Sequence, residues 1–117
     1  MMMDWNAYEQ QVLSTVGELA KLSPDTVRGY SVLSAANSKN GHLDPKTRQL
    51  ISLAVAVTTR CDGCITIHTH EAYKLGATRE EISEALGVAV AMNAGAALVY
   101  STRVLDAYDA KAASDKK

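Results

Sequence analysis

The chain has 117 residues, the size of one domain, and is long enough for a hydrophobic core that needs no disulfide or metal. Its composition, 47% hydrophobic and 21% charged, is that of an ordinary soluble protein, and the net charge of −1 argues against nucleic-acid binding. There is no Phe and only 5% of residues are aromatic, so Ala, Val, Leu and Ile must supply most of the core, which suits closely packed helices.

No targeting or membrane segment is predicted. The start, Met-Met-Met-Asp-Trp-Asn, lacks the basic and long apolar regions of a signal peptide, so we expect a cytoplasmic protein whose thiols are kept reduced. The longest apolar run, 85–100, is interrupted by Gly87, Asn93 and Gly95 and is shorter than the roughly 20 residues of a membrane span. It predicts a buried helix, and no membrane partner is expected.

The first half of the chain predicts three helices. Apolar residues recur at helical spacing over 4–20. Ser23-Pro24 supplies an N-cap and a first-turn proline for a second helix, which we expect to end in the polar segment 37–41. Asp44-Pro45 repeats this signal and opens a third helix, largely buried, that runs to about Thr58.

The second half predicts three more helices. Gly76 is a candidate C-terminal glycine, Thr78 and Glu81 form a capping box, and 93–95 should break the helix that follows. The elements are therefore a fourth helix from 59–61 to Gly76, a fifth from Thr78 to Asn93, a sixth to about Ala110 and a frayed tail over 111–117. We expect one all-α domain, 1–117, a bundle of about six helices. The last two are apolar on more than one side, which predicts an oligomer.

Both cysteines and two of the three histidines lie in 58–70, with the spacing Cys61-x2-Cys64-x3-His68. At roughly 100° per residue these three side chains fall within about 60° of one another on a helix, and Cys64 and His68 are i,i+4 neighbours. His70 falls on roughly the opposite face, so it is not a fourth member of the cluster. The spacing predicts a dithiol redox site on the first turns of a helix.

The chemistry of these residue types fits this geometry. A helix N-terminus stabilises the reactive thiolate, and Arg60 adds a nearby positive charge. Attack on a peroxide would convert Cys64 to a sulfenic acid, and Cys61 would resolve it to a disulfide. His68 would take or relay the proton of Cys64, and a reductant would restore the dithiol by exchange.

Other interpretations stay open from the residues alone. Cys-x2-Cys-x3-His could bind zinc, but structural zinc usually has four ligands and there is no second cysteine pair, so we expect no metal. The cysteines could also be inert and buried beside a core histidine. Gln49 lies on the apolar side of the third helix and either reaches toward the dithiol or keeps its amide in water. Glu71, beyond His68, is either an orienting group or a solvated glutamate.

Three stretches in order, Leu43 to Ala56, Cys61 to His68 and Gly76 to Ile82, resemble the carboxymuconolactone decarboxylase and AhpD-like superfamily, over about 43–108. The resemblance implies an all-helical fold that assembles into trimers or hexamers. We expect no cofactor. The AhpD branch carries a Glu, eleven further residues and then Cys-x2-Cys-x3-His. Members of that branch act as thiol-dependent peroxidases or pass electrons from lipoyl groups to a peroxiredoxin. The decarboxylase branch lacks the cysteine pair.

By that pattern Cys61, Cys64 and His68 match directly, and Gly63 occupies the place of a second histidine found in some members. Gln49 stands where the pattern has Glu, and an amide cannot accept and return a proton as a carboxylate can. We therefore expect a dithiol oxidoreductase that reduces hydroperoxides slowly with a lipoyl or thioredoxin-like donor. The alternatives are a non-catalytic thiol switch or binding module, and a decarboxylase-like enzyme acting on a lactone.

Overall fold

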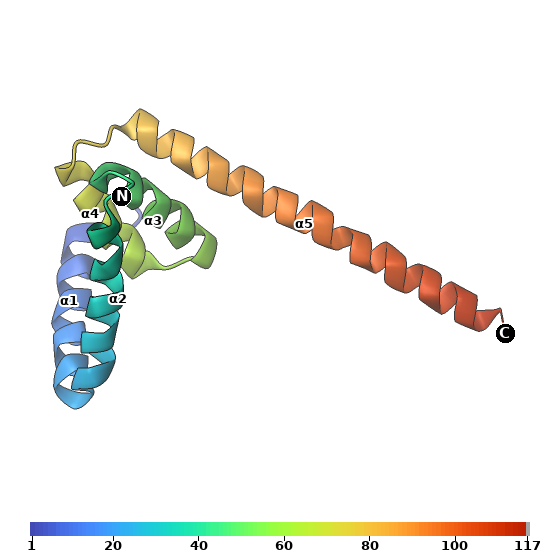
Figure 1. The fold of residues 1–117 in the computed structure, drawn as a ribbon, viewed down its shortest axis with the longest axis horizontal. Coiled ribbons are helices and arrows are strands. Elements are labelled where there is room, and N and C mark those ends of the chain that lie inside the picture. Colours follow the sequence, from blue (N-terminus) through green and yellow to red (C-terminus); the bar gives the residue numbers. More distant parts are fainter. Residues whose placement is uncertain (117) are drawn as a thin grey trace.

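The computed structural model describes residues 1–116, and its elements are five helices (Figure 1): α1 (Trp5–Leu22), α2 (Pro24–Asn40), α3 (Pro45–Thr59), α4 (Asp62–Lys74) and α5 (Arg79–Asp115). The residues described contain no strand. The predicted all-α fold is confirmed, although the two helices expected at the end of the chain are one helix.

Helices α1 and α2 form an antiparallel pair (Figure 1). Asp4 caps α1 by accepting a hydrogen bond from the Ala7 N–H, and Ser23 ends α1 and precedes Pro24 at the start of α2. The prediction that the second helix ends within 37–41 is confirmed. It runs to Asn40 and ends at Gly41, whose φ of 72° is left-handed, a conformation that glycine adopts without strain.

The core lies where α3, α4 and the first turns of α5 meet, and it is small. Within residues 1–116 only four apolar residues are buried: Leu53 and Ala56 of α3, Ala72 of α4 and Ala89 of α5. Three of the four are alanines, whose small side chains let the helices approach closely, as the composition predicted. Thr66 of α4 is also buried, and its hydroxyl donates to the Trp5 carbonyl at 3.0 Å, which fixes α1 on α4.

Helix α5 is continuous over 37 residues, so the predicted break at 93–95 is wrong. The Asn93 amide donates to the Ala89 carbonyl of its own helix at 2.7 Å and to the Thr58 hydroxyl at 2.9 Å, and both contacts are compatible with an uninterrupted helix. A glycine inside a helix, such as Gly95, costs only about 1 kcal/mol relative to Ala. The tail expected to fray is helical as far as Asp115. The capping box of Thr78 and Glu81 begins α5, as predicted.

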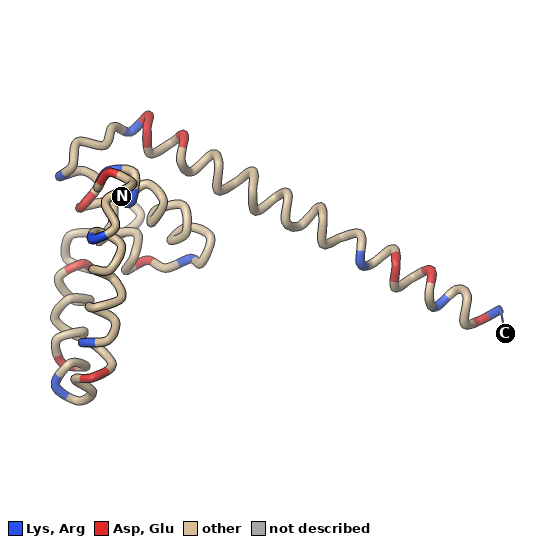
Figure 2. Tube along the Cα trace, viewed as in Figure 1, with Lys and Arg blue, Asp and Glu red and all other residues tan. Residues whose placement is uncertain are grey.

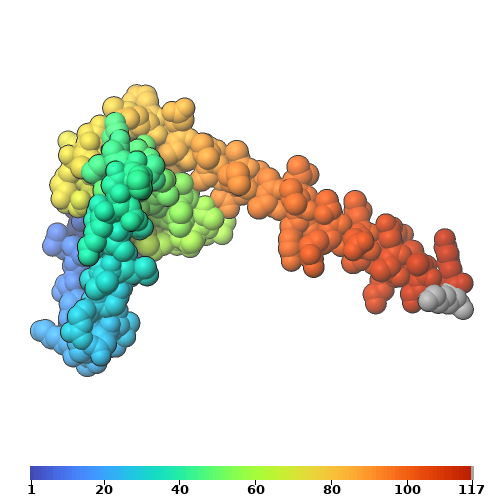
Figure 3. Space-filling model, in the orientation of Figure 1, coloured from blue at the N-terminus to red at the C-terminus, as the bar shows by residue number. Residues whose placement is uncertain are grey.

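Beyond its first turns α5 extends away from the other helices (Figures 1 and 3). No charged residue occurs over 85–102, and Figure 2 shows this stretch as uncharged. Its large apolar side chains are mostly exposed, for example Leu98 at 74% and Tyr100 at 63%. The prediction of a buried helix is therefore wrong for the single chain. By length and composition alone, α5 could cross a membrane, and only 6% of its most apolar window is buried.

The extended shape leaves an unusual amount of surface exposed. The radius of gyration is 20.1 Å, whereas a compact chain of this length would have about 13 Å. The accessible surface is 9399 Å², against roughly 6,200 Å² for a compact monomer of 12.5 kDa. The single chain therefore exposes about 3,000 Å² more surface than a compact chain of its mass, and many of its exposed large apolar side chains belong to α5.

Candidate active site

The two cysteines lie at the start of α4, joined as a disulfide with a Cα–Cα distance of 5.2 Å. Cys61 is the N-cap of the helix, and its sulfur accepts a hydrogen bond from the Cys64 N–H at 3.2 Å. Both residues are half-buried. The same N–H and the positive end of α4 would stabilise a thiolate on Cys61 in the reduced protein.

A short turn between α3 and α4 carries this cysteine. Arg60 ends α3 with φ 55°, a left-handed conformation that is uncommon for any residue other than glycine. The Arg60 N–H and the Cys61 N–H both donate to the carbonyl of Ala56, which is 2% exposed. The turn is thus anchored to the core, and it places a guanidinium next to the dithiol in sequence.

His68 and Gln49 are brought together from α4 and α3. His68 Nδ1 lies 2.8 Å from Gln49 Oε1, and both residues are half-buried. Because the amide oxygen only accepts hydrogen bonds, Nδ1 is the donor, and Nε2 of the neutral ring is left as the proton acceptor. Gln49 therefore reaches into the site and does not keep its amide in water. It orients His68 as a carboxylate would, but it cannot take a proton from it.

Gly63, between the cysteines, faces α1. A Cβ placed on it would lie 3.6 Å from Val12 Cγ1, which is ordinary van der Waals contact. A methyl group would therefore fit here, whereas a side chain larger than Ala would press against Val12 of α1.

The remaining titratable residues singled out in the sequence lie elsewhere. His70 Nδ1 is 3.0 Å from Glu9 Oε1 of α1, on the other side of α4, as the helical spacing predicted. Glu71 pairs with Lys74 at 3.0 Å, and His42 lines a separate cavity beside Arg48. Within residues 1–116, no three His, Cys, Asp or Glu side chains are grouped closely enough to hold a metal ion.

The Glu9–His70 contact was not predicted, because the two residues are 61 positions apart in the chain and neither belongs to the cysteine–histidine motif. Glu9 is 9% exposed, and a carboxylate this buried requires a partner. Its spacing within the apolar stripe of α1 was the one available signal, since it lies one turn after Trp5. The pair joins α1 to α4 on the face opposite the dithiol.

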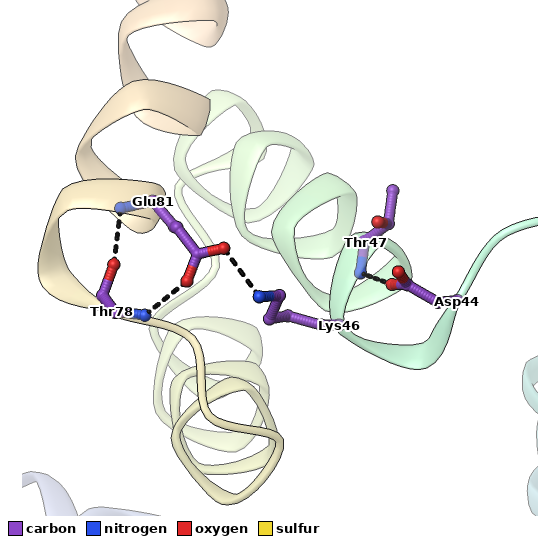
Figure 4. A network of polar contacts seen from close by, with 5 residues as sticks. All are labelled: Asp44, Lys46, Thr47, Thr78 and Glu81. Carbon is purple, nitrogen blue, oxygen red and sulfur yellow. Dashed lines mark hydrogen bonds and ion pairs between the residues drawn. The ribbon is translucent and has the colours of Figure 1, made fainter.

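A second unpredicted network joins the starts of α3 and α5 (Figure 4). Lys46 Nζ lies 2.7 Å from Glu81 Oε2, while the other oxygen of Glu81 accepts from the Thr78 N–H. The hydrogen bond to Lys46 holds the pKa of Glu81 below its usual value, and the bond to Glu81 raises the pKa of Lys46. The Thr47 N–H likewise lowers the pKa of Asp44, the cap of α3.

These shifts predict loss of stability in acid. A carboxyl whose pKa is lowered by folding stabilises the fold above its unfolded pKa of about 4, and that contribution is lost as the pH falls through the lower, folded value. Lys46 acts in the opposite direction, and its contribution is lost only when the pH rises through its raised pKa. We expect the thermal midpoint to be flat near neutrality and to fall below about pH 4.

Glu81→Gln is the matched control, because Gln at this position preserves the capping box and removes the ion pair. Its midpoint should fall less steeply in acid than that of the unmodified protein. Equal acid slopes, measured by circular dichroism, would show that Glu81 does not contribute through its charge.

Comparison with known proteins identifies the family. Residues 24–107 match the model of the carboxymuconolactone decarboxylase family, so the match begins earlier than the expected 43. An uncharacterized protein of Haemophilus influenzae is 48% identical over 113 residues, 97% of this chain and 100% of that protein. Uncharacterized protein 4 in the cox locus of Paracoccus denitrificans is 38% identical over 96 residues, covering 82% of this chain and 86% of that one.

A solved structure agrees. The crystal structure of a carboxymuconolactone decarboxylase family protein from Legionella pneumophila, in its apo form, has a TM-score of 0.72 and 38% identity. The superposition covers 90% of this chain and 94% of that one. With a family match over most of its length and relatives above 30% identity, the chain belongs to the carboxymuconolactone decarboxylase family.

Proposed function

We propose that this protein is an AhpD-like dithiol oxidoreductase that reduces hydroperoxides, with Cys61, Cys64, His68 and Gln49 as its site. The observation that carries the proposal is the contact of His68 Nδ1 with Gln49 Oε1, next to a cysteine pair at a helix start. That contact leaves the Nε2 of His68 as a base one helical turn from Cys64.

The reaction needs no metal or cofactor. His68 Nε2 takes the proton of the Cys64 thiol, and the thiolate attacks the O–O bond of the hydroperoxide. Cys64 becomes a sulfenic acid, and the alkoxide leaves as an alcohol after accepting a proton. The Cys61 thiolate then attacks the Cys64 sulfur, so a disulfide forms and water leaves. A dithiol donor reduces the disulfide by two exchange steps.

The partners of this reaction follow from the same chemistry. The donor is a lipoyl or thioredoxin-like dithiol of the cytoplasm, because a dithiol completes both exchange steps without leaving a mixed disulfide. The assembly is a homo-oligomer, a trimer or hexamer. This oligomer is supported by the exposed surface, which is much larger than that of a compact monomer, and by the apolar sequence of α5.

The central test is the replacement Gln49→Glu. A carboxylate both orients His68 and stabilises its protonated form, and general acid–base effects of this kind reach about 10²–10⁴-fold. We expect peroxide consumption with dihydrolipoamide to rise at least roughly tenfold. Dithiothreitol and thioredoxin should be compared as donors in the same assay.

Gln49→Leu serves as the control, since it fills a similar volume but leaves the His68 Nδ1–H unpaired. Its rate should be lower than that of the unmodified protein. A flat or reduced rate in Gln49→Glu, with unchanged circular dichroism, would mean that Gln49 does not occupy the relay position.

One observation favours a second function. Because the Gln49 amide cannot relay a proton, the dithiol could serve as a redox switch without turnover. A reversible Cys61–Cys64 disulfide in a protein that consumes no peroxide would identify that function.

A further inference from the structure

Two side-chain contacts tie α3 to α5. One is the ion pair of Lys46 with Glu81 at 2.7 Å, and the other is the hydrogen bond from Asn93 Nδ2 to Thr58 Oγ1 at 2.9 Å. Lys46 and Thr58 are twelve residues apart, and so are Glu81 and Asn93. Twelve residues span about 18 Å in any α-helix. The two helices therefore run parallel, and both contacts form together only in this one axial register.

In the sequence, each contact lies just before one half of the candidate site, the first half being Gln49 and the second the cysteine pair that begins at Cys61. Gln49 follows Lys46 by three residues, and Cys61 follows Thr58 by three. The Thr58 hydroxyl accepts from Asn93 and donates to the Ala54 carbonyl at 2.8 Å, so it continues a chain of hydrogen bonds from α5 into α3. The register of α3 on α5 thus determines where both halves of the site stand.

Only a short turn separates Thr58 from the dithiol. Thr59 ends α3, Arg60 is left-handed, and the Cys61 N–H donates to the buried Ala56 carbonyl at 3.0 Å. The geometry of this turn decides whether the Cys61 sulfur meets the Cys64 N–H. A displacement of the end of α3 would carry the sulfur away from the group that stabilises its thiolate.

Asn93 is also an unexpected residue at its place in the helix. It is the one amide side chain in the charge-free stretch 85–102, where Asn forms helix less readily than the surrounding Ala. Both hydrogens of its amide group are used, one by Thr58 and one by the Ala89 carbonyl. An amide that hydrogen-bonds to a neighbouring helix from an otherwise mostly apolar stretch is well suited to fix the register of the two helices.

We propose that Asn93 is a positioning residue of the dithiol site: through Thr58 it fixes the end of α3, and with it the turn that holds the Cys61 sulfur on the Cys64 N–H. The inference rests on the proposed thiol chemistry of Cys61 and Cys64. It does not depend on peroxide being the oxidant.

The test measures the pH dependence of cysteine alkylation by iodoacetamide in the reduced full-length protein, followed by mass spectrometry. Thr58→Val and Asn93→Leu should each shift the alkylation midpoint to higher pH. The rate at pH 7 should fall by about three- to tenfold, the factor expected for one lost hydrogen bond. Because both variants break the same bond, the double variant should show no larger shift than either alone.

Two matched variants isolate the contact with Asn93. Thr58→Ser keeps the hydroxyl and should restore the original pH profile. Ser52→Ala removes another hydroxyl of α3 that donates back to its own helix, to the Arg48 carbonyl at 2.9 Å, and should leave the profile unchanged because Ser52 lies away from the turn. Thermal unfolding and light scattering of each variant show that fold and assembly are intact. If Asn93→Leu alters the assembly, Thr58→Val decides the outcome.

The proposal is overturned if Thr58→Val behaves like Ser52→Ala, or if the two single effects add in the double variant. Alkylation does not require turnover, so this outcome is distinct from failure of the proposed function. A shifted alkylation profile in a protein that consumes no peroxide would support the positioning role and reject the peroxidase.

Discussion

Replacement of Cys64 by Ser is expected to abolish thiol-dependent peroxide consumption. The serine hydroxyl has no accessible anionic form near neutral pH, and neither His68 nor the start of α4 can make it a comparable nucleophile toward an O–O bond. The rate should fall to that of buffer with donor alone, a loss of at least roughly 10³-fold. A coupled assay with dihydrolipoamide measures this directly.

The variant Cys61→Ser separates the attack of Cys64 on the hydroperoxide from the resolution of its sulfenic acid by Cys61. Cys64 and His68 remain, so this variant should consume about one equivalent of peroxide and then stop with a sulfenic acid that dimedone can trap. His70→Asn is the matched histidine control, because His70 contacts Glu9 on the opposite side of α4. Its rate should be unchanged. Undiminished turnover in Cys64→Ser would reject the mechanism, and a trapped sulfenic acid in that variant would assign the attack to Cys61.

The parts of the fold that could be predicted are those governed by neighbours in the sequence. Asp44-Pro45 and the Thr78–Glu81 box begin helices because their side chains bond to N–H groups three residues on. The spacing of Cys61, Cys64 and His68 correctly placed these three residues on one side of α4. The same spacing placed His70 on the opposite side. Gln49 was identified from the spacing of the family pattern. Helical periodicity alone does not indicate that a residue of α3 contacts His68 of α4.

The parts that could not be predicted depend on contacts between distant segments. Asn93 and Gly95 are weak helix formers, and the sequence does not show that Thr58 lies within reach of Asn93. The same holds for Glu9 with His70. The exposure of α5 is a further case: its apolar sequence indicates burial, and the single chain does not supply the neighbours that would bury it.

The second large effect that we expect concerns the parts of the assembly that would cover α5. The exposed apolar side chains of α5 do not form one stripe. Counted at about 100° per residue, Leu98 and Leu105 lie on one side, Val88 and Val99 about a quarter-turn away, and Tyr100 on another. A helix that is apolar on all sides is stable in water only when it is surrounded. Pairing with one other helix would cover one side, so α5 needs more than one neighbouring helix, and we propose that further copies of the chain supply them.

We therefore expect Leu98→Glu combined with Leu105→Glu to dissociate the assembly. The two leucines lie seven residues apart on one face and are 74% and 68% exposed in the single chain. Each contributes about 1.5–3 kcal/mol when buried, and an unpaired carboxylate in its place costs several kcal/mol more. Summed over the copies, the dissociation constant should rise more than roughly 100-fold.

Light scattering at micromolar concentration distinguishes whether copies of the chain or a lipid bilayer cover the apolar surface of α5. The unmodified protein should have a mass several times 12.5 kDa. The double variant should be monomeric, or should remain soluble only with a reduced helix content. The control Asp115→Lys, near the end of the same helix, should match the unmodified protein. A monomeric unmodified protein in detergent-free buffer would reject assembly through α5. Recovery only with membranes, solubilised by detergent, would make a bilayer the partner. The surface excess favours copies of the chain, because about 3,000 Å² per chain, or roughly 6,000 Å² for each pair of chains, reaches the large interface areas that obligate oligomers bury.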